Sequence, residues 1–332
     1  MDRLEIDATE RRELNRILDE IEGDFEDLES DDALQRSTLR AHELPSRIRA
    51  TLNAFRMEQM SGVLCISGYV VDQDRVGPTP AHWRDRPARY PTRREELLLI
   101  LFSSLLGDPF GWATQQNGRL IHDVLPIKGH EHEQLGSSSE APLTWHTEDA
   151  FHPLRGDFLS FACLRNPYSA ATMIGYADSL DLPGATRNVL FEERFGIRPD
   201  ESHLAKNNSA RDAAIFSQVN ELQGSPPPVA LLFGDPARPY IRADPYFTTV
   251  EPGDHEAQDA LDRLVSDMDQ KIFDLELQSG DFCFIDNFRV VHGRKPFKAR
   301  HDGTDRWLKR VNISRDLRKS RAARNGSSRT IS

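Results

Sequence analysis

Apolar positions recur with a helical period near the start of the chain. Within residues 8–28 they stand three or four positions apart, with charged residues between them: Leu14, Ile17, Leu18 and Ile21. Because residues at this spacing share one face of a helix, the pattern predicts an amphipathic helix. Residues 45–54 predict a second, short helix, and the strongly apolar stretch 95–106 predicts a buried one. We therefore expect a helical region over about residues 1–60.

From about residue 120 onward the pattern is typical of strands. Short stretches rich in β-branched and aromatic residues alternate with turns that contain Gly, Pro and polar residues. The predicted strands, with one more near the N-terminus, are residues 62–71, 120–127, 144–148, 158–164, 171–177, 229–233, 282–285 and 307–314. Two further helices are predicted at 183–195 and 255–273. Many short strands separated by turns favour an α+β fold with a jelly-roll-like core flanked by helices.

Two segments stand apart from this pattern. Residues 206–228 contain Asn, Ser, Gly and three consecutive prolines, and a stretch of this length without predicted structure is typical of a functional lid. The basic, polar segment 318–332 predicts a frayed tail rather than an arm that binds nucleic acid. Since the chain has no internal repeat, we expect a single domain over residues 1–332.

Composition narrows the classes of protein that this chain can represent. Its 332 residues carry a net charge of −11, which argues against general nucleic-acid binding. The longest apolar run, residues 97–106, is too short to span a bilayer, and the charged N-terminus lacks the apolar core of a signal peptide. Cys65, Cys163 and Cys283 predict buried thiols in a reducing compartment. We expect a cytoplasmic protein with a small-molecule ligand and no membrane or nucleic-acid partner; the sequence leaves its oligomeric state open.

The segment Trp145-His146-Thr147-Glu148 carries the most informative chemistry. On a strand, residues two apart face the same side, so His146 and Glu148 would project together. His292, at the end of an apolar run, is a candidate third ligand from another strand. Two histidines and one carboxylate leave positions open on iron(II) for a chelating cosubstrate and O2. A His-x-Glu pair alone is weak evidence, because histidines and carboxylates also occur close together by chance, as in the polar stretch 130–133, whose histidines we expect to be solvated.

A second group of candidate residues lies along the predicted strand 307–314. Alternation places Arg306 and Arg310 on the same face, roughly 13 Å apart at ~3.3 Å per residue. A guanidinium binds a carboxylate through two parallel hydrogen bonds, so the pair suits two carboxylates, one of 2-oxoglutarate and one of a substrate. Without the metal motif, two surface arginines on an edge strand remain the alternative.

At four segments the chain resembles the clavaminate synthase-like 2-oxoglutarate oxygenases, and among them the enzymes that hydroxylate free arginine, asparagine or lysine at the β-carbon. The segments are FGWATQQNGRLIHDVLPIKG, SSSEAPLTWHTEDAFHPLRGDFLSFACLRNP, FIDNFRVVHGRKPF and DGTDRWLKRVNISRDL. The resemblance runs from about residue 41 to about residue 321. It implies a distorted double-stranded β-helix, in agreement with the jelly-roll expectation, and a lid at 206–228.

The resemblance also implies which residues hold the cofactors. His146, Glu148 and His292 fall on the family's iron triad. Arg306 falls on the arginine that binds the distal carboxylate of 2-oxoglutarate, with Thr172 beside it. The implied cofactors are Fe(II), 2-oxoglutarate and O2, and the implied reaction is hydroxylation of a free L-amino acid.

Substrate-binding residues are implied in the same way. Arg310 falls on the arginine that takes the substrate α-carboxylate, and Gln115 on a residue that contacts the substrate amine, which a free oxygen of Glu148 would also contact. In the arginine hydroxylases two aspartates, two residues apart, bind the guanidinium; here Asp244 remains and Tyr246 stands at the second position. One carboxylate and a phenol suit a compact ammonium better than a guanidinium. We therefore expect hydroxylation at C3 of lysine first, arginine second and asparagine third, although an Asp before a proline is equally typical of a turn.

Two other classes of protein stay open. A zinc hydrolase could use the same three ligands, but the arginine pair at 306 and 310 would have no role in it. A non-catalytic jelly-roll binding protein would bury His146 and His292 in its core. Turnover of 2-oxoglutarate separates an oxygenase from both.

Overall fold

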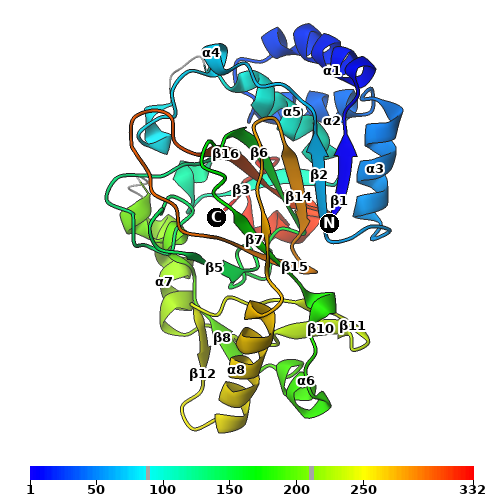
Figure 1. Ribbon diagram of the computed structural model, residues 1–332. Helices are drawn as coiled ribbons and strands as arrows, with labels where there is room; N and C mark the ends of the chain where they lie inside the picture. Colours follow the sequence, from blue (N-terminus) through cyan, green and yellow to red (C-terminus); the bar gives the residue numbers. More distant parts are fainter. Residues whose placement is uncertain (87–89, 209–212) are drawn as a thin grey trace.

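The strands of the chain form two main sheets (Figure 1). The computed structural model describes residues 1–86, 90–208 and 213–332. In the larger sheet the strand order is β1 (Asp2–Glu5), β2 (Val63–Ser67), β14 (Phe282–Asp286), β6 (Phe158–Arg165), β16 (Trp307–Ser314), β3 (Asp108–Trp112) and β17 (Thr330–Ile331), and β4 (His122–Val124) also pairs with β16. The smaller sheet has the order β13 (Phe273–Leu275), β7 (Thr172–Tyr176), β15 (Val290–Arg294) and β5 (Leu143–His146).

A shared apolar core joins the two sheets. Leu159 and Phe161, which alternate along β6 of the larger sheet, belong to one buried cluster with Ile174 on β7 and Val290 on β15 of the smaller sheet. Side chains that alternate along facing strands fill the space between two packed sheets in this way. All three cysteines lie in the same cluster, so they are buried as predicted. Two packed sheets together with helices agree with the predicted α+β fold.

Helices from the first third of the chain cover the outer face of the larger sheet (Figure 1). They are α1 (Ala8–Ile21), α2 (Asp31–Ala41), α3 (Ser46–Arg56) and α5 (Arg93–Ser104). Asp7 and Glu10 form a capping box at the start of α1, which satisfies N–H groups that the helix leaves free. The pattern did not predict α2, because its buried face includes small or polar residues (Ala33, Ser37 and Ala41) and carries little apolar signal.

A second helical layer covers the smaller sheet at the opposite end of the molecule (Figure 1). Trp145 and Val291 of that sheet share an apolar cluster with Leu190 of α6 (Gly184–Leu190) and Leu264 of α8 (His255–Asp269). Small sheets lie beside these helices: β12 (Thr248–Val250), β8 (Phe195–Ile197) and β9 (Pro228–Val229) form one, and β10 (Leu232–Asp235) and β11 (Arg238–Ile241) form another. The remaining short helices are α4 (Gln73–Val76), η1 (Glu22–Asp24), η2 (Trp83–Asp85), η3 (Gln116–Gly118), η4 (Ala177–Ser179), η5 (Glu201–His203), η6 (Ala205–Asn207), η7 (Ala213–Phe216) and η8 (Leu317–Ala323).

Segments that were expected to be irregular contain regular elements. The predicted lid 206–228 contains a helix, α7 (Ser217–Gly224), and the strand β9; its residues 209–212 lie outside the described ranges. The predicted strand 229–233 is divided between β9 and β10. The tail is not frayed where it ends, because β17 pairs in parallel with β3 and Ile331 is buried against Phe110 and Trp112.

A buried lysine fixes the position of β16. Lys309 is fully buried, and its ammonium contacts Glu96 at 2.8 Å, the Tyr90 hydroxyl at 2.9 Å and the carboxylate of Asp123. These contacts lie on the helical side of the larger sheet, since Glu96 belongs to α5. Alternation along the strand therefore turns the neighbouring Arg310 toward the inside of the sandwich. Within the described ranges no helix has the length and apolar character needed to cross a membrane.

Candidate active site

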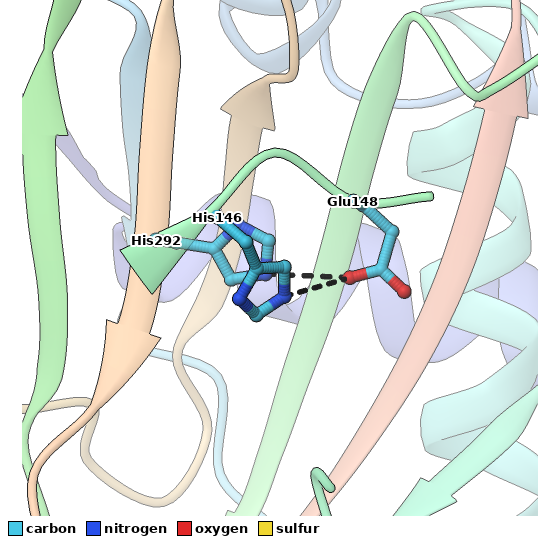
Figure 2. Close-up of side chains that lie close together, drawn as sticks. All are labelled: His146, Glu148 and His292. Atoms are coloured by element: carbon cyan, nitrogen blue, oxygen red, sulfur yellow. Dashed lines mark ion pairs between the residues drawn. The ribbon is translucent and has the colours of Figure 1, made fainter. Parts of the chain in front are cut away.

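The neighbouring strands β5 and β15, together with the turn that follows β5, bring His146, Glu148 and His292 together (Figure 2). His146 is the last residue of β5, and it pairs in register with His292 on β15. Glu148 Oε2 lies 3.7 Å from His146 Nε2 and 3.4 Å from His292 Nε2. The predicted strand 144–148 was too long, because β5 ends at His146 and Glu148 lies in the turn beyond it. The three side chains nevertheless converge, as the spacing predicted.

Hydrogen bonds hold each of these side chains in place. His146 Nδ1 lies 2.8 Å from the Thr144 carbonyl, to which it donates, so Nε2 is the ring nitrogen that faces Glu148 and the point where the three side chains converge. The backbone N–H of Glu148 donates to Asn287 Oδ1 at 2.7 Å, and the Asn287 amide donates back to the Glu148 carbonyl at 3.0 Å. Two imidazole nitrogens and a carboxylate oxygen, preoriented toward one point, are the donor set that suits iron(II).

Burial and charge shift the pKa of all three groups. Burial alone would raise the pKa of Glu148, but the guanidinium of Arg310 and the two histidines hold it well below its usual range. Burial lowers the pKa of His292 to about 4. Burial also opposes protonation of His146, yet its hydrogen bond to Glu148 and the negative charge of Asp244 raise its pKa to about 9. An ionised carboxylate and a neutral His292 are the forms in which these residues bind a metal.

A buried arginine without a counter-ion lies beside this triad. Arg306, just before β16, is only 6% exposed, and its Nε has no hydrogen-bond partner within the described ranges. Burial lowers the pKa of Arg306 to about 10, which reflects the cost of keeping this charge away from water. Thr172, the first residue of β7, lines the same pocket. Within the described ranges this guanidinium has no counter-ion, and it shares a pocket with a hydroxyl, so it fits an incoming carboxylate such as 2-oxoglutarate would supply.

Arg310 is placed on the other side of the triad. Its Nη1 donates to Glu148 Oε1, while Nη2 lies 3.2 Å from Gln115 Oε1 and 2.8 Å from His122 Nδ1. Its Nε is buried without a partner in the described part of the chain, so the guanidinium retains capacity for another acceptor. Gln115 lies behind Arg310, in a side cavity that Ser202 also lines.

Carboxylates outside the triad also line the pocket. The predicted residue Asp244 faces the pocket and also caps a turn, since its Oδ1 accepts from the N–H groups of Tyr246 and Phe247 at 3.1 and 3.3 Å. Burial raises the pKa of Asp244 to about 6. Tyr246 lines the rim of the pocket but is 57% exposed. Asp200 and Ser202, which the sequence analysis missed, line the pocket as well.

The remaining histidines of interest have other surroundings. His132 is exposed, and His130 lies 2.8 Å from the Ser137 hydroxyl. His152 is buried beside Trp112, with ring centroids 4.6 Å apart, and accepts a hydrogen bond from the Leu154 N–H. The hydrogen bond and ring contact of His152 are thus made with residues outside the triad.

Comparison with known proteins identifies the class of enzyme to which this site belongs. Residues 198–312 match the family model of the taurine catabolism dioxygenase TauD, TfdA family. The chain is 44% identical over 334 residues to the L-ornithine/L-arginine 3-hydroxylase of Catenulispora acidiphila, which covers 98% of this chain and 97% of the relative. The L-lysine 3-hydroxylase of the same organism is 30% identical over 306 residues, covering 91% of this chain and 81% of the relative.

A solved structure agrees with these sequence relatives. The non-heme iron oxygenase OrfP in complex with Fe, succinate and (3S)-hydroxy-L-Arg superposes with a TM-score of 0.96 at 43% identity, and the match covers 100% of both chains. The protein is thus a non-haem iron, 2-oxoglutarate-dependent dioxygenase of the amino-acid hydroxylase class. It belongs to the TauD/TfdA family, among its clavaminate synthase-like oxygenases.

Proposed function

We propose that this enzyme hydroxylates a free cationic amino acid at C3, and that L-arginine, or an amino acid with a similar side chain, is its preferred substrate. The observation that carries the proposal is the presence of two carboxylates, Asp200 and Asp244, in one pocket with the iron-binding triad. A planar guanidinium prefers paired acceptors, and two carboxylates supply them. The identity to an L-ornithine/L-arginine 3-hydroxylase supports the same substrate class.

The expected preference for lysine over arginine is not supported. It rested on Tyr246 standing at the position of a second carboxylate, but Asp200 reaches the pocket from a distant part of the chain. The order of identity among the relatives also favours arginine over lysine, at 44% against 30%. We therefore rank arginine first, with ornithine and lysine as the substrates against which it is compared.

The cofactors have residues that fit them. His146, Glu148 and His292 would hold iron, and Arg306 with Thr172 would hold the distal carboxylate of 2-oxoglutarate. Iron(II) with 2-oxoglutarate and O2 supplies the oxidising chemistry that converts a C–H bond into C–OH while 2-oxoglutarate becomes succinate and CO2. Neither a zinc hydrolase nor a non-catalytic binding protein accounts for the family membership.

The chain's own residues bind and orient the amino acid. Arg310 would take the α-carboxylate, and Gln115 and Glu148 would contact the amine. Asp200 and Asp244 would hold the cationic end of the side chain, with Tyr246 at the rim. Fixing both ends of a flexible substrate restricts which carbon faces the metal, and such positioning contributes a large part of the rate of an enzyme reaction.

A direct test compares amino acids and one pair of variants. The purified enzyme is supplied with iron(II), 2-oxoglutarate and air, and arginine, ornithine, lysine and asparagine are added separately while succinate and oxygenated product are measured. We expect arginine to give the highest kcat/KM. Asp200→Asn should raise the KM for arginine about tenfold, because it removes one charged acceptor.

The matched control for that variant is Glu201→Gln. Glu201 is the next residue, but its carboxylate pairs with Lys206 at 3.1 Å on the surface, so this change should leave the KM for arginine within twofold. A higher kcat/KM for lysine than for arginine, or equal effects of the two substitutions, would contradict the proposal.

A further inference from the structure

A second cluster of acidic and histidine side chains lies next to the metal triad. Atoms of Asp149, Asp200 and His203 lie within 4.8 Å of one another, and Asp149 and His203 are fully buried. This cluster is stable without an ion, because its groups bond to each other and to neutral donors. His203 Nε2 lies 2.9 Å from Asp149 Oδ1, and the other oxygen of Asp149 accepts from Trp112 Nε1 at 2.6 Å. The cluster therefore joins two parts of the chain, the turn that contains Asp149 and the segment that contains Asp200 and His203.

We propose that His203 is a positioning residue, which fixes Asp200 and Ser202 against the substrate pocket by tying them to Asp149. This inference rests on the proposed function, since it assigns Asp200 to the cationic end of the substrate. Both ring nitrogens of His203 are engaged: Nε2 bonds to Asp149, and Nδ1 lies 2.6 Å from the Thr114 hydroxyl. The ring also packs edge-on against Phe151, with centroids 4.8 Å apart. These contacts leave the imidazole little freedom to rotate.

The partners of His203 are themselves rigidly held. Asp149 directly follows Glu148 and has a backbone φ of 52°, in the left-handed region. Its carboxylate accepts from Trp112 on β3 and, at 3.3 Å, from Asn312 on β16. A carboxylate bonded to two strands of the larger sheet provides a fixed reference point. His203 therefore connects the segment that contains Asp200 and Ser202, which line the pocket, with Asp149, the residue that follows Glu148.

Further contacts link the same segment to the substrate-binding arginine. Asp200 Oδ1 accepts from the N–H of Ser202 at 2.8 Å and from its hydroxyl at 2.5 Å. The amide of Gln115 donates to the Ser202 hydroxyl at 2.6 Å, and its oxygen accepts from Arg310 Nη2 at 3.2 Å. The residues that would hold the two ends of the substrate, Asp200 and Arg310, are thus joined through one network of hydrogen bonds. We infer that this network sets the distance between them.

Loss of these hydrogen bonds should weaken binding of the amino acid and leave binding of 2-oxoglutarate unchanged. Arg306 and Thr172 line the same pocket as Asp200, but they make no contact with His203 in the described structure. If Asp200 moves, the amino acid binds more weakly and its C3 is held less accurately, and a displacement of about 1 Å is enough to slow a reaction strongly. 2-Oxoglutarate would then be consumed without hydroxylation in a larger share of turnovers.

The test uses two substitutions of His203 and one matched control. His203→Phe keeps an aromatic ring of similar size but removes both hydrogen bonds, whereas His203→Gln retains a donor that can reach Asp149. His152→Phe removes another buried histidine from the same aromatic cluster, one whose side chain has no hydrogen bond to Asp149 or Asp200 within the described ranges; the bond from its backbone N–H to the Asp149 carbonyl at 2.9 Å is unaffected by the substitution. Thermal stability, KM for both substrates, and product formed per 2-oxoglutarate consumed are measured with the amino acid that the wild-type enzyme hydroxylates. Amide hydrogen exchange at residues 200–208 is measured in the substrate-free protein.

The three variants have distinct expected results. In His203→Phe the KM for the amino acid should rise about tenfold, the loss expected from a hydrogen bond to a charged group, and product per 2-oxoglutarate should fall at least twofold. Its KM for 2-oxoglutarate should stay within twofold, and exchange at 200–208 should accelerate. His203→Gln should recover most of both effects, and His152→Phe should lose thermal stability without a change in KM or coupling.

The outcomes separate this inference from the proposed function. Wild-type KM and coupling in His203→Phe, or the same values in His203→Phe and His152→Phe, would overturn the role of His203. No turnover of arginine by the wild-type enzyme, with another amino acid hydroxylated instead, would refute the choice of arginine. The variants would then be measured with that amino acid, and the same comparison would decide on His203.

Discussion

Arg306 allows a substitution whose effects on stability and on cofactor binding are opposite in sign. Arg306→Met removes a buried guanidinium that has no counter-ion in the described structure. A buried charge of this kind costs free energy, so replacing it with an apolar side chain of similar length should keep or raise the free energy of unfolding without ligand. With 2-oxoglutarate, the same change removes a paired, charge-assisted contact of about 3 kcal/mol, which is roughly a hundredfold in affinity.

Thermal denaturation with and without 2-oxoglutarate measures both effects. A ligand at about a hundred times its Kd stabilises the folded state by about 2.7 kcal/mol, and after a hundredfold loss of affinity only about 0.4 kcal/mol remains. The variant should therefore melt at or above the wild-type temperature without 2-oxoglutarate and show almost no further rise with it. Steady-state kinetics should show a KM for 2-oxoglutarate raised roughly a hundredfold.

Arg294→Met is the control for this argument. Arg294 lines the same pocket, but its guanidinium donates to the Ser138 hydroxyl at 2.7 Å and to backbone carbonyls of Ser139, Ala141 and Lys295 at 2.9–3.0 Å. Its loss should lower the melting temperature in the absence of any ligand. If Arg306→Met were the less stable of the two and bound 2-oxoglutarate normally, the reasoning would be refuted.

Three further predictions follow from the geometry. His146→Ala should abolish stoichiometric iron(II) binding in equilibrium dialysis. The control His132→Ala, at a side chain that is 78% exposed, should still bind iron(II). Equal iron(II) binding by the two variants would exclude the triad as the iron site. Burial raises the pKa of Asp244 to about 6, and only the ionised carboxylate attracts a cation. The KM for arginine should therefore rise about tenfold for each pH unit below about 6. A parallel rise in the KM for 2-oxoglutarate would assign the effect to another group. Lys309→Met should lower the free energy of unfolding by about 3–5 kcal/mol in urea titrations, because it leaves the buried Asp123 carboxylate without its cation and Glu96 with Arg86 alone. A loss below about 1 kcal/mol would contradict this assignment.

Local pattern was sufficient to predict the strands that carry the metal and cofactor residues. β16 spans the residues that alternation indicated, and its two faces separate Lys309 from Arg310 as the period of two requires. His146 and His292 converge because their strands pair in register, and the sequence pattern did not specify this long-range pairing. The exact end of β5 was beyond this reasoning, since the Glu148 turn depends on its bonds to Asn287 far along the chain.

Asp200 and Ser202 illustrate what a local pattern cannot supply. Their segment lies in 3-10 turns without an apolar period, and its bonds to the rest of the chain, from His203 to Asp149 and from Gln115 to Ser202, join residues far apart in the sequence. The ranking of lysine over arginine failed for this reason, because it counted only carboxylates adjacent in sequence to Asp244. The docking of the tail was missed in the same way, since the apolar Ile331 finds its partners on β3.

The central claim is that the iron-binding triad uses O2 and 2-oxoglutarate to hydroxylate a cationic amino acid. Its most direct test is a reaction with arginine under isotopically heavy O2, followed by mass spectrometry of both products. The account predicts one heavy oxygen atom in hydroxyarginine and one in succinate, formed in equal amounts. An unlabelled product, or succinate formed at the same rate whether or not a cationic amino acid is present, would contradict it.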